Sequence, residues 1–114
     1  MALGTDTQID PEMGTNAYEL EIYVDYGMSA MEAIQSATPN ACEAIELDRE
    51  IGTLEAGKLG DIIAAEGDPL KDIRVLQDKK QIQMIVKEGK IYVLGKPEKE
   101  RYVTPDSEWS WKRI

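Results

Sequence analysis

The hydrophobic pattern changes near residue 48, and this change constrains the fold more than any other feature of the chain. Before it, the stretches 16–27, 29–37 and 38–47 carry apolar residues three and four positions apart, which predicts three helices. After it, apolar residues occur in short β-branched runs, and two of these flank Glu88-Gly89-Lys90. Such an arrangement predicts a β-hairpin. The expected fold class is therefore α+β.

The pattern also predicts how the chain is divided. Helices are expected within residues 1–50, a small sheet with its hairpin within residues 51–95, and a charged surface arm over residues 96–114. The sheet should contain strands at 62–65, 82–87 and 91–94, each a short apolar run next to turn residues.

Capping residues mark the predicted helix starts. Asn16 with Glu19, and Ser29 with Glu32, have the spacing of capping boxes, in which two side chains satisfy free backbone N–H groups. Pro39 is well placed in the first turn of the third helix, where its missing N–H has no helical partner to lose.

Charge and cysteine content narrow the possible partners. With 13 basic and 22 acidic residues the formal net charge is −9, so nucleic acid and anionic membrane surfaces are not expected partners.

Cys42 is the only cysteine, which rules out an internal disulfide, and its apolar neighbours indicate a small buried residue. No run of about 20 apolar residues and no signal-peptide pattern is present, and we expect a cytoplasmic protein.

Several motifs follow one another in a specific order. They are Leu3-Gly4-Thr5-Asp6, Gly27-Met28-Ser29-Ala30-Met31-Glu32-Ala33-Ile34, Gly52-Thr53-Leu54-Glu55-Ala56-Gly57-Lys58-Leu59-Gly60-Asp61 and Gly67-Asp68-Pro69-Leu70. In this order and spacing, over roughly residues 2–95, the chain resembles the C-terminal end of the metal-dependent amidohydrolase superfamily. The resemblance is to the imidazolonepropionase-like and Xaa-Pro dipeptidase (prolidase) branch.

The resemblance implies a fold and a function. Residues 1–50 would hold the last strand of a (β/α)8 barrel, at residues 1–3, and the terminal helices after it. The following residues would form the C-terminal half of a small composite β-sandwich. The implied activity is metal-dependent hydrolysis of C–N bonds in amides or dipeptides, and the family uses zinc or another divalent metal.

Asp6 is the candidate catalytic and metal-binding residue that the resemblance names. It corresponds to the aspartate at the end of the last barrel strand, which contacts the metal and helps to deprotonate the hydrolytic water. The family draws most of its ligands from histidine, and this chain has no histidine. We therefore expect an incomplete site, no metal cofactor and no catalysis in this chain alone. From its spacing alone, Asp6 is a loop aspartate that bonds local backbone N–H groups.

An alternative function needs no catalysis. In the family, strands from both ends of the polypeptide form the sheet, and a hairpin with unpaired edges is marginal by itself. The chain is therefore expected either to associate with an N-terminal barrel segment or to form a homo-oligomer whose copies complete one another's sheet. In the second case it would be a non-catalytic, self-associating structural module.

Other polar residues have simpler interpretations. Four acidic residues near the first helix are conceivable ligands for a hard cation, namely Asp10, Glu12, Glu19 and Glu21. Their spacing does not match a calcium-binding loop, which predicts a solvated acidic face instead. Gly57-Lys58 lacks the spacing of a phosphate-binding loop. Asp61 and Asp68 are predicted to serve turns and caps. In the tail, Trp109 and Trp111 would share one face of a strand that docks on the sheet or a partner, unless this end is disordered.

Overall fold

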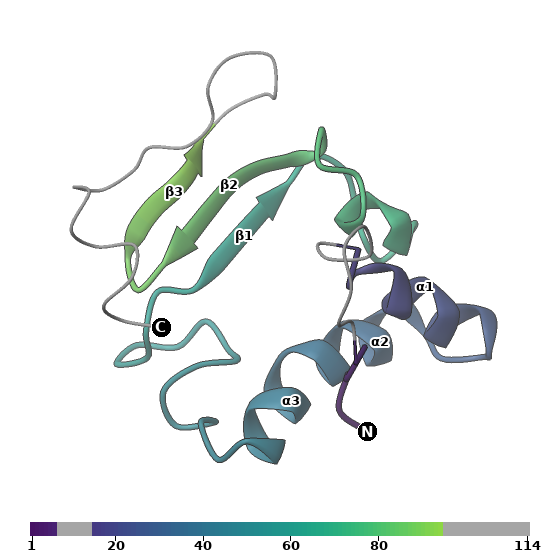
Figure 1. The fold of residues 1–114 in the computed structure, drawn as a ribbon. Helices are drawn as coiled ribbons and strands as arrows, with labels where there is room; N and C mark the ends of the chain where they lie inside the picture. Colours follow the sequence, from purple (N-terminus) through teal and green to yellow (C-terminus); the bar gives the residue numbers. More distant parts are fainter. Residues whose placement is uncertain (7–14, 95–114) are drawn as a thin grey trace.

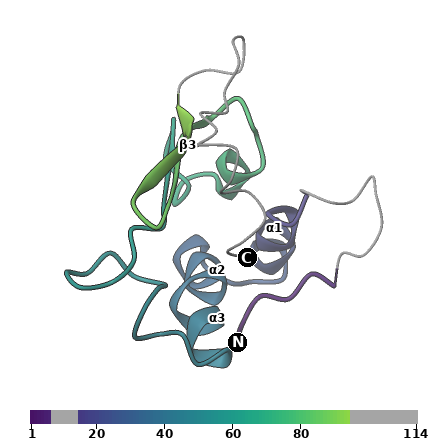
Figure 2. The ribbon, with the colours of Figure 1, turned by 60° about the vertical axis from the view of Figure 1, so that its left-hand side comes forward.

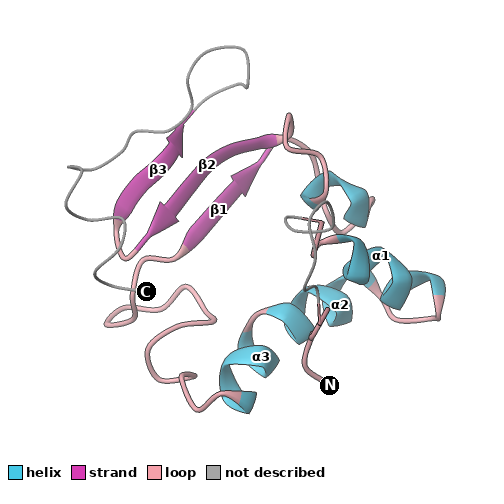
Figure 3. Ribbon diagram, viewed as in Figure 1, coloured by secondary structure: helices cyan, strands magenta, loops and turns pink. Residues whose placement is uncertain are grey.

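The computed structural model describes residues 1–6 and 15–94, and it separates helices from strands (Figure 1). The helices are α1 (Tyr18–Asp25), α2 (Ala30–Ala37) and α3 (Pro39–Ala44). The strands are β1 (Ile62–Ala65), β2 (Ile82–Lys87) and β3 (Lys90–Leu94), and the short 3-10 helix η1 (Ile73–Leu76) joins β1 to β2. Figure 3 shows that η1 lies on the helical side, against α1. The predicted α+β class is confirmed.

The three strands form an antiparallel sheet in the order β1-β2-β3. Figures 1 and 2 show the sheet at one end of the molecule and the three α-helices gathered at the other. Among the described residues, none of the helices has the length and apolarity needed to cross a bilayer.

The hairpin between β2 and β3 turns on two residues with positive φ. Lys87 pairs with Lys90, and between them Glu88 has φ 51° and Gly89 has φ 76°. Two successive positive φ angles are the requirement of the type I′ turn, which matches the twist of the strands. The left-handed backbone of Glu88 is held from outside the hairpin, because its N–H donates to Asp61 Oδ1 at 2.8 Å. The predicted hairpin is confirmed.

Two of the predicted helix starts are also confirmed. At the start of α2, the Glu32 N–H donates to Ser29 Oγ at 3.2 Å, and the Ser29 N–H donates to Glu32 Oε2 at 2.9 Å. This is the complete capping box. Pro39 is the first residue of α3.

The capping box expected at α1 is wrong. This helix begins at Tyr18, with Ala17 as its N-cap and no side-chain cap. The Asn16 side chain is engaged elsewhere, because its Nδ2 donates to Thr5 Oγ1 at 2.9 Å. A side-chain cap typically stabilises a helix by about 1 kcal/mol, and α1 forms without that contribution.

The helical core is built on small and branched side chains. Its centre consists of three buried residues from α1, α2 and η1, which are Leu20, Ala33 and Ile73. Ala33 is fully buried, and its small side chain permits the close approach of neighbouring elements that the alanine-rich stripe of α2 predicts. Leu3 from the N-terminal segment packs against this core.

The strand predicted at residues 1–3 is not formed. Residues 1–6 are coil, and their backbone is bonded by the helices instead. The Leu3 N–H donates to the Ser36 carbonyl at 2.8 Å, and Asn40 Nδ2 donates to the Met1 carbonyl at 3.1 Å. The physical reason is that a strand needs a neighbouring strand to bond its backbone groups. In the described part of the chain, none of the three strands pairs with this segment. The predicted arm over 96–114, with its two tryptophans, lies outside the described residues.

Candidate functional site

Asp6 stands at the end of an N-terminal segment that the helices hold at alternate residues. The Met1 carbonyl, the Leu3 N–H and the Thr5 hydroxyl each have a hydrogen-bond partner in the helical region. Their partners there are Asn40, Ser36 and Asn16. One backbone bond and two bonds that involve side chains therefore hold the segment against the helical region.

The Asp6 side chain is exposed, and its φ of 49° places its backbone in the left-handed region. Aspartate is among the few residues that adopt this conformation readily. Thr5, directly before it, is half-buried against Asn16. The exposed carboxylate thus directly follows the residue that Asn16 holds.

The residues present do not fit a complete metal site. Within residues 1–6 and 15–94, there is no cluster of three or more histidine, cysteine, aspartate or glutamate residues able to hold an ion. The whole chain also has no histidine. Catalytic zinc sites use three protein ligands as a rule, whereas Asp6 offers a single carboxylate. Among the described residues, the acidic group that the resemblance assigns to such a site is the carboxylate of Asp6 alone.

A hollow of about 260 Å³ lies between the start of α1 and the connection from η1 to β2. It is lined by Thr15, Ala17, Tyr18, Leu76, Gln77, Lys79 and Ile82. Asp6 does not line it. Among the described residues, the candidate site is therefore the exposed carboxylate of Asp6, which lies outside this hollow.

The motif from Gly52 to Asp61 has a structural role. Lys58 Nζ donates to the Asp48 carbonyl at 2.6 Å and to Thr53 Oγ1 at 2.7 Å, and Glu55 lies 3.8 Å away. Only 16% of the Lys58 side chain is exposed. Its ammonium group is surrounded by oxygen atoms of its own loop, so Lys58 is not a phosphate ligand.

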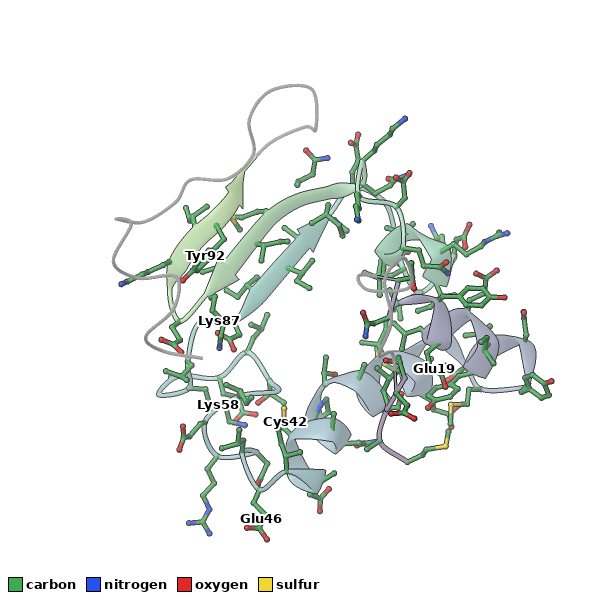
Figure 4. The ribbon with its side chains drawn as sticks, in the orientation of Figure 1. Glu19, Cys42, Glu46, Lys58, Lys87 and Tyr92 are labelled. Atoms are coloured by element: carbon green, nitrogen blue, oxygen red, sulfur yellow. The ribbon has the colours of Figure 1, made fainter. Side chains whose placement is uncertain are left out.

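The same loop packs against α3. Cys42 is buried and points from α3 toward this loop (Figure 4). At Gly52, with φ 98°, an added Cβ would lie 2.8 Å from Cys42 Sγ. The prediction that Cys42 is a small buried residue is confirmed.

Asp61 links the motif to the hairpin. Its Oδ2 accepts a hydrogen bond from Lys87 Nζ at 2.8 Å, and Lys87 lies at the hairpin end of β2 (Figure 4). Burial has the largest single effect on the pKa of Asp61 and raises it, but Lys87 and the Glu88 N–H together outweigh it and lower the pKa. Asp68 Oδ1 accepts from the Leu70 N–H at 3.0 Å. The local turn role predicted for Asp68 is confirmed, whereas Asp61 bonds the distant hairpin turn and not its own.

The predicted solvated acidic face is wrong for α1. Glu21 is half-buried and accepts a hydrogen bond from Gln77 Nε2 at 2.6 Å, because η1 packs against this helix. Glu19 is also half-buried. Burial raises the pKa of Tyr23, and the charge and hydrogen bond of Glu19 raise it further. Two of the four acidic residues proposed as conceivable cation ligands, Asp10 and Glu12, lie outside the described residues.

Comparisons with known proteins agree on one family. The family model described as "Amidohydrolase family" matches residues 1–92, which includes Asp6. The chain is 39% identical over 94 residues to an ochratoxinase from Aspergillus niger, which covers 81% of this chain and 19% of that protein. It is 33% identical over 67 residues to an imidazolonepropionase from Symbiobacterium thermophilum, covering 59% of this chain and 16% of that one.

A solved structure has the same fold over most of the chain. The crystal structure of a Xaa-Pro dipeptidase with bound methionine in the active site matches with a TM-score of 0.73 and 40% identity. The match covers 80% of this chain and 21% of the dipeptidase. The chain thus spans about one fifth of the length of the ochratoxinase and of the dipeptidase. Since the family model extends from residue 1 to residue 92, the chain belongs to the amidohydrolase family.

Proposed function

We propose that this chain is the C-terminal portion of a metal-dependent hydrolase that cleaves C–N bonds in amides or dipeptides. The observation that carries the proposal is the 40% identity to a Xaa-Pro dipeptidase over four fifths of the chain. The family match includes Asp6, whose carboxylate is exposed at the end of a fixed segment. The proposed assembly is a (β/α)8 barrel to which residues 1–50 add the terminal helices, with residues 1–3, which are coil here, pairing as the last strand only when barrel strands lie beside them.

The proposed chemical role of Asp6 is that of a general base. Hydrolysis of an amide requires water to lose a proton as it attacks the carbonyl carbon, and a carboxylate within hydrogen-bond reach can accept that proton. Amidohydrolases in general use a divalent metal, which acidifies bound water. Because this chain has no histidine, imidazole ligands for such a metal must come from residues beyond these 114.

The sheet supports the need for further residues. Among the described strands, β1 has only β2 as a neighbour, so its other edge is unpaired there. Ile63 in β1 is 63% exposed and Leu54 in the preceding loop is 76% exposed. We propose that strands from the rest of the hydrolase pair with this sheet and complete a composite β-sandwich.

The same exposed edge favours a second candidate function. An unpaired strand edge can pair with another copy of the chain as readily as with a different segment. The chain would then be a self-associating structural module without turnover. Sedimentation at micromolar concentration distinguishes this candidate, because it requires a dimer or larger assembly, and a compact monomer excludes it.

Activity is tested in a chimera in which this chain replaces the matching segment of the Xaa-Pro dipeptidase. We expect the chimera to hydrolyse Xaa-Pro dipeptides and Asp6→Asn to lower kcat by about 10²–10⁴-fold, the usual contribution of a general base. Asp48→Asn is the matched control, since it makes the same chemical change at an exposed loop position and should leave kcat unchanged. If Asp6→Asn is as active as its parent, Asp6 has no catalytic role.

A further inference from the structure

Asn16 connects α1 to the residue directly before Asp6. Its Nδ2 donates to Thr5 Oγ1 at 2.9 Å across 11 positions of sequence, while the N-terminus of α1 has no side-chain cap. Asparagine is among the best N-cap residues. The side chain that could cap this helix is therefore used to hold the N-terminal segment.

The position of Gly4 explains why a hold at Thr5 matters. Before Gly4, the Leu3 N–H donates to the carbonyl of Ser36, which is buried. Gly4 follows this anchor, and an added Cβ there would meet nothing within 4 Å. A glycine in open space leaves the backbone free to rotate. The hydrogen bond from Asn16 Nδ2 to Thr5 Oγ1 lies beyond Gly4 and restrains the residue next to Asp6.

We infer that Asn16, acting through Thr5, is a positioning residue for the Asp6 carboxylate. The inference rests on the proposed function, because it concerns the hydrolysis in which Asp6 accepts a proton. Proton transfer depends steeply on the placement of the base, and displacement by about 1 Å can reduce a rate 10²-fold. Asn16 acts on Asp6 indirectly, because its hydrogen bond to Thr5 Oγ1 restrains the rotation that Gly4 permits.

The kinetic test uses the dipeptidase chimera. Asn16→Ala and Thr5→Val are each expected to lower kcat about tenfold with KM changed by less than about twofold, as for a misplaced base. Thr5→Ser keeps the hydroxyl and should retain the parent kcat. Thr53→Val is the matched control, because it removes a hydroxyl that accepts a side-chain hydrogen bond from Lys58 in a different loop. It should leave kcat unchanged.

A purely structural role is separated from positioning by combining substitutions. In an Asp6→Asn background, Asn16→Ala should cause no further loss of kcat, because the base that it positions is gone. A full additional tenfold loss would overturn the inference. If Asp6→Asn is inactive while Asn16→Ala and Thr5→Val match the parent, positioning is refuted and the proposed function stands. If Asp6→Asn is fully active, the catalytic role proposed for Asp6 fails, and the inference about Asn16 fails with it.

A second measurement needs no activity. In the 114-residue chain, the ¹⁵N order parameter of the Asp6 amide reports the rigidity of the segment end. Asn16→Ala and Thr5→Val should lower it, and Thr53→Val should not. An Asp6 order parameter that is unchanged by both substitutions, or already low in the parent chain, would overturn the inference.

Discussion

Replacing Gly52 with alanine should destabilise the chain more than the same change at Gly57. Both glycines have positive φ, 98° and 93°, where a side chain is strained. They differ in their surroundings. A Cβ at Gly52 would lie 2.8 Å from Cys42 Sγ and 3.3 Å from the Pro39 Cα, whereas a Cβ at Gly57 would meet nothing within 4 Å. The pair therefore separates crowding from backbone strain.

The expected magnitudes follow from these contacts. A left-handed backbone costs a residue with a side chain about 1–2 kcal/mol, and this cost applies at both positions. Crowding in a packed region adds about 1–3 kcal/mol, and it applies at Gly52 alone. We expect a loss of about 2–5 kcal/mol for Gly52→Ala and about 1–2 kcal/mol for Gly57→Ala. The entropy that alanine removes from the unfolded chain is the same for both variants and cancels in the comparison.

Urea unfolding followed by far-UV circular dichroism measures both losses, provided that the m-value is unchanged. A double-mutant cycle with Cys42→Ala tests the contact itself. Removing Sγ should recover part of the Gly52→Ala loss, because these two sites are in contact and cannot be additive. Equal losses for Gly52→Ala and Gly57→Ala would refute the packing of this loop against α3.

Three further predictions concern the loop, a helix cap and a pH response. Lys58→Met should destabilise the chain by about 2–3 kcal/mol in urea unfolding, since it deletes two hydrogen bonds from a charged donor. The Lys71 side chain is 86% exposed, so Lys71→Met should cost less than about 0.5 kcal/mol. Equal losses for the two variants would contradict this prediction. Ser29→Ala should cost about 1 kcal/mol through its capping box, and an unchanged urea midpoint would show that the cap contributes nothing. Burial has the largest effect on the pKa of Asp61 and raises it, but the hydrogen bonds of Asp61 and the Lys87 charge hold the pKa below its ordinary 3.8. The ionised Asp61 carboxylate therefore stabilises the folded chain, and this contribution is lost as pH falls through the folded pKa. Asp61→Asn should therefore lose less stability than the parent below about pH 4, and identical acid-unfolding curves would oppose this.

Elements whose signals are local in sequence were predictable. Ser29 and Glu32 lie three residues apart and cap one helix, so their spacing contains the whole interaction. Glu88-Gly89 is likewise sufficient to predict the hairpin turn, although the hydrogen bond from the Glu88 N–H to Asp61 becomes visible only in the structure.

The failures have the opposite cause. Asn16 has the spacing of a cap, but its actual partner, Thr5, is 11 residues away and competes successfully for its amide. The place of Glu21 in the sequence predicts a solvated side chain, yet its partner Gln77 is 56 residues away. The strand expected at residues 1–3 required neighbouring strands that the described residues do not provide.

The candidate site was only partly predictable for the same reason. The resemblance identified Asp6, and the sequence established that histidine ligands are missing. Neither could show that the segment before Asp6 is held at alternate residues by the helices. That arrangement depends on backbone groups, such as the Leu3 N–H and the Ser36 carbonyl, which leave no trace in residue identity.

The most direct test of the account is the hydrolysis of Xaa-Pro dipeptides by this chain, before and after it is mixed with the complementary N-terminal portion of the dipeptidase and zinc. We predict no turnover before mixing and turnover afterwards, with zinc bound only in the mixed sample. Rapid hydrolysis with stoichiometric metal in the 114-residue chain alone would contradict the claim that its site is completed from outside.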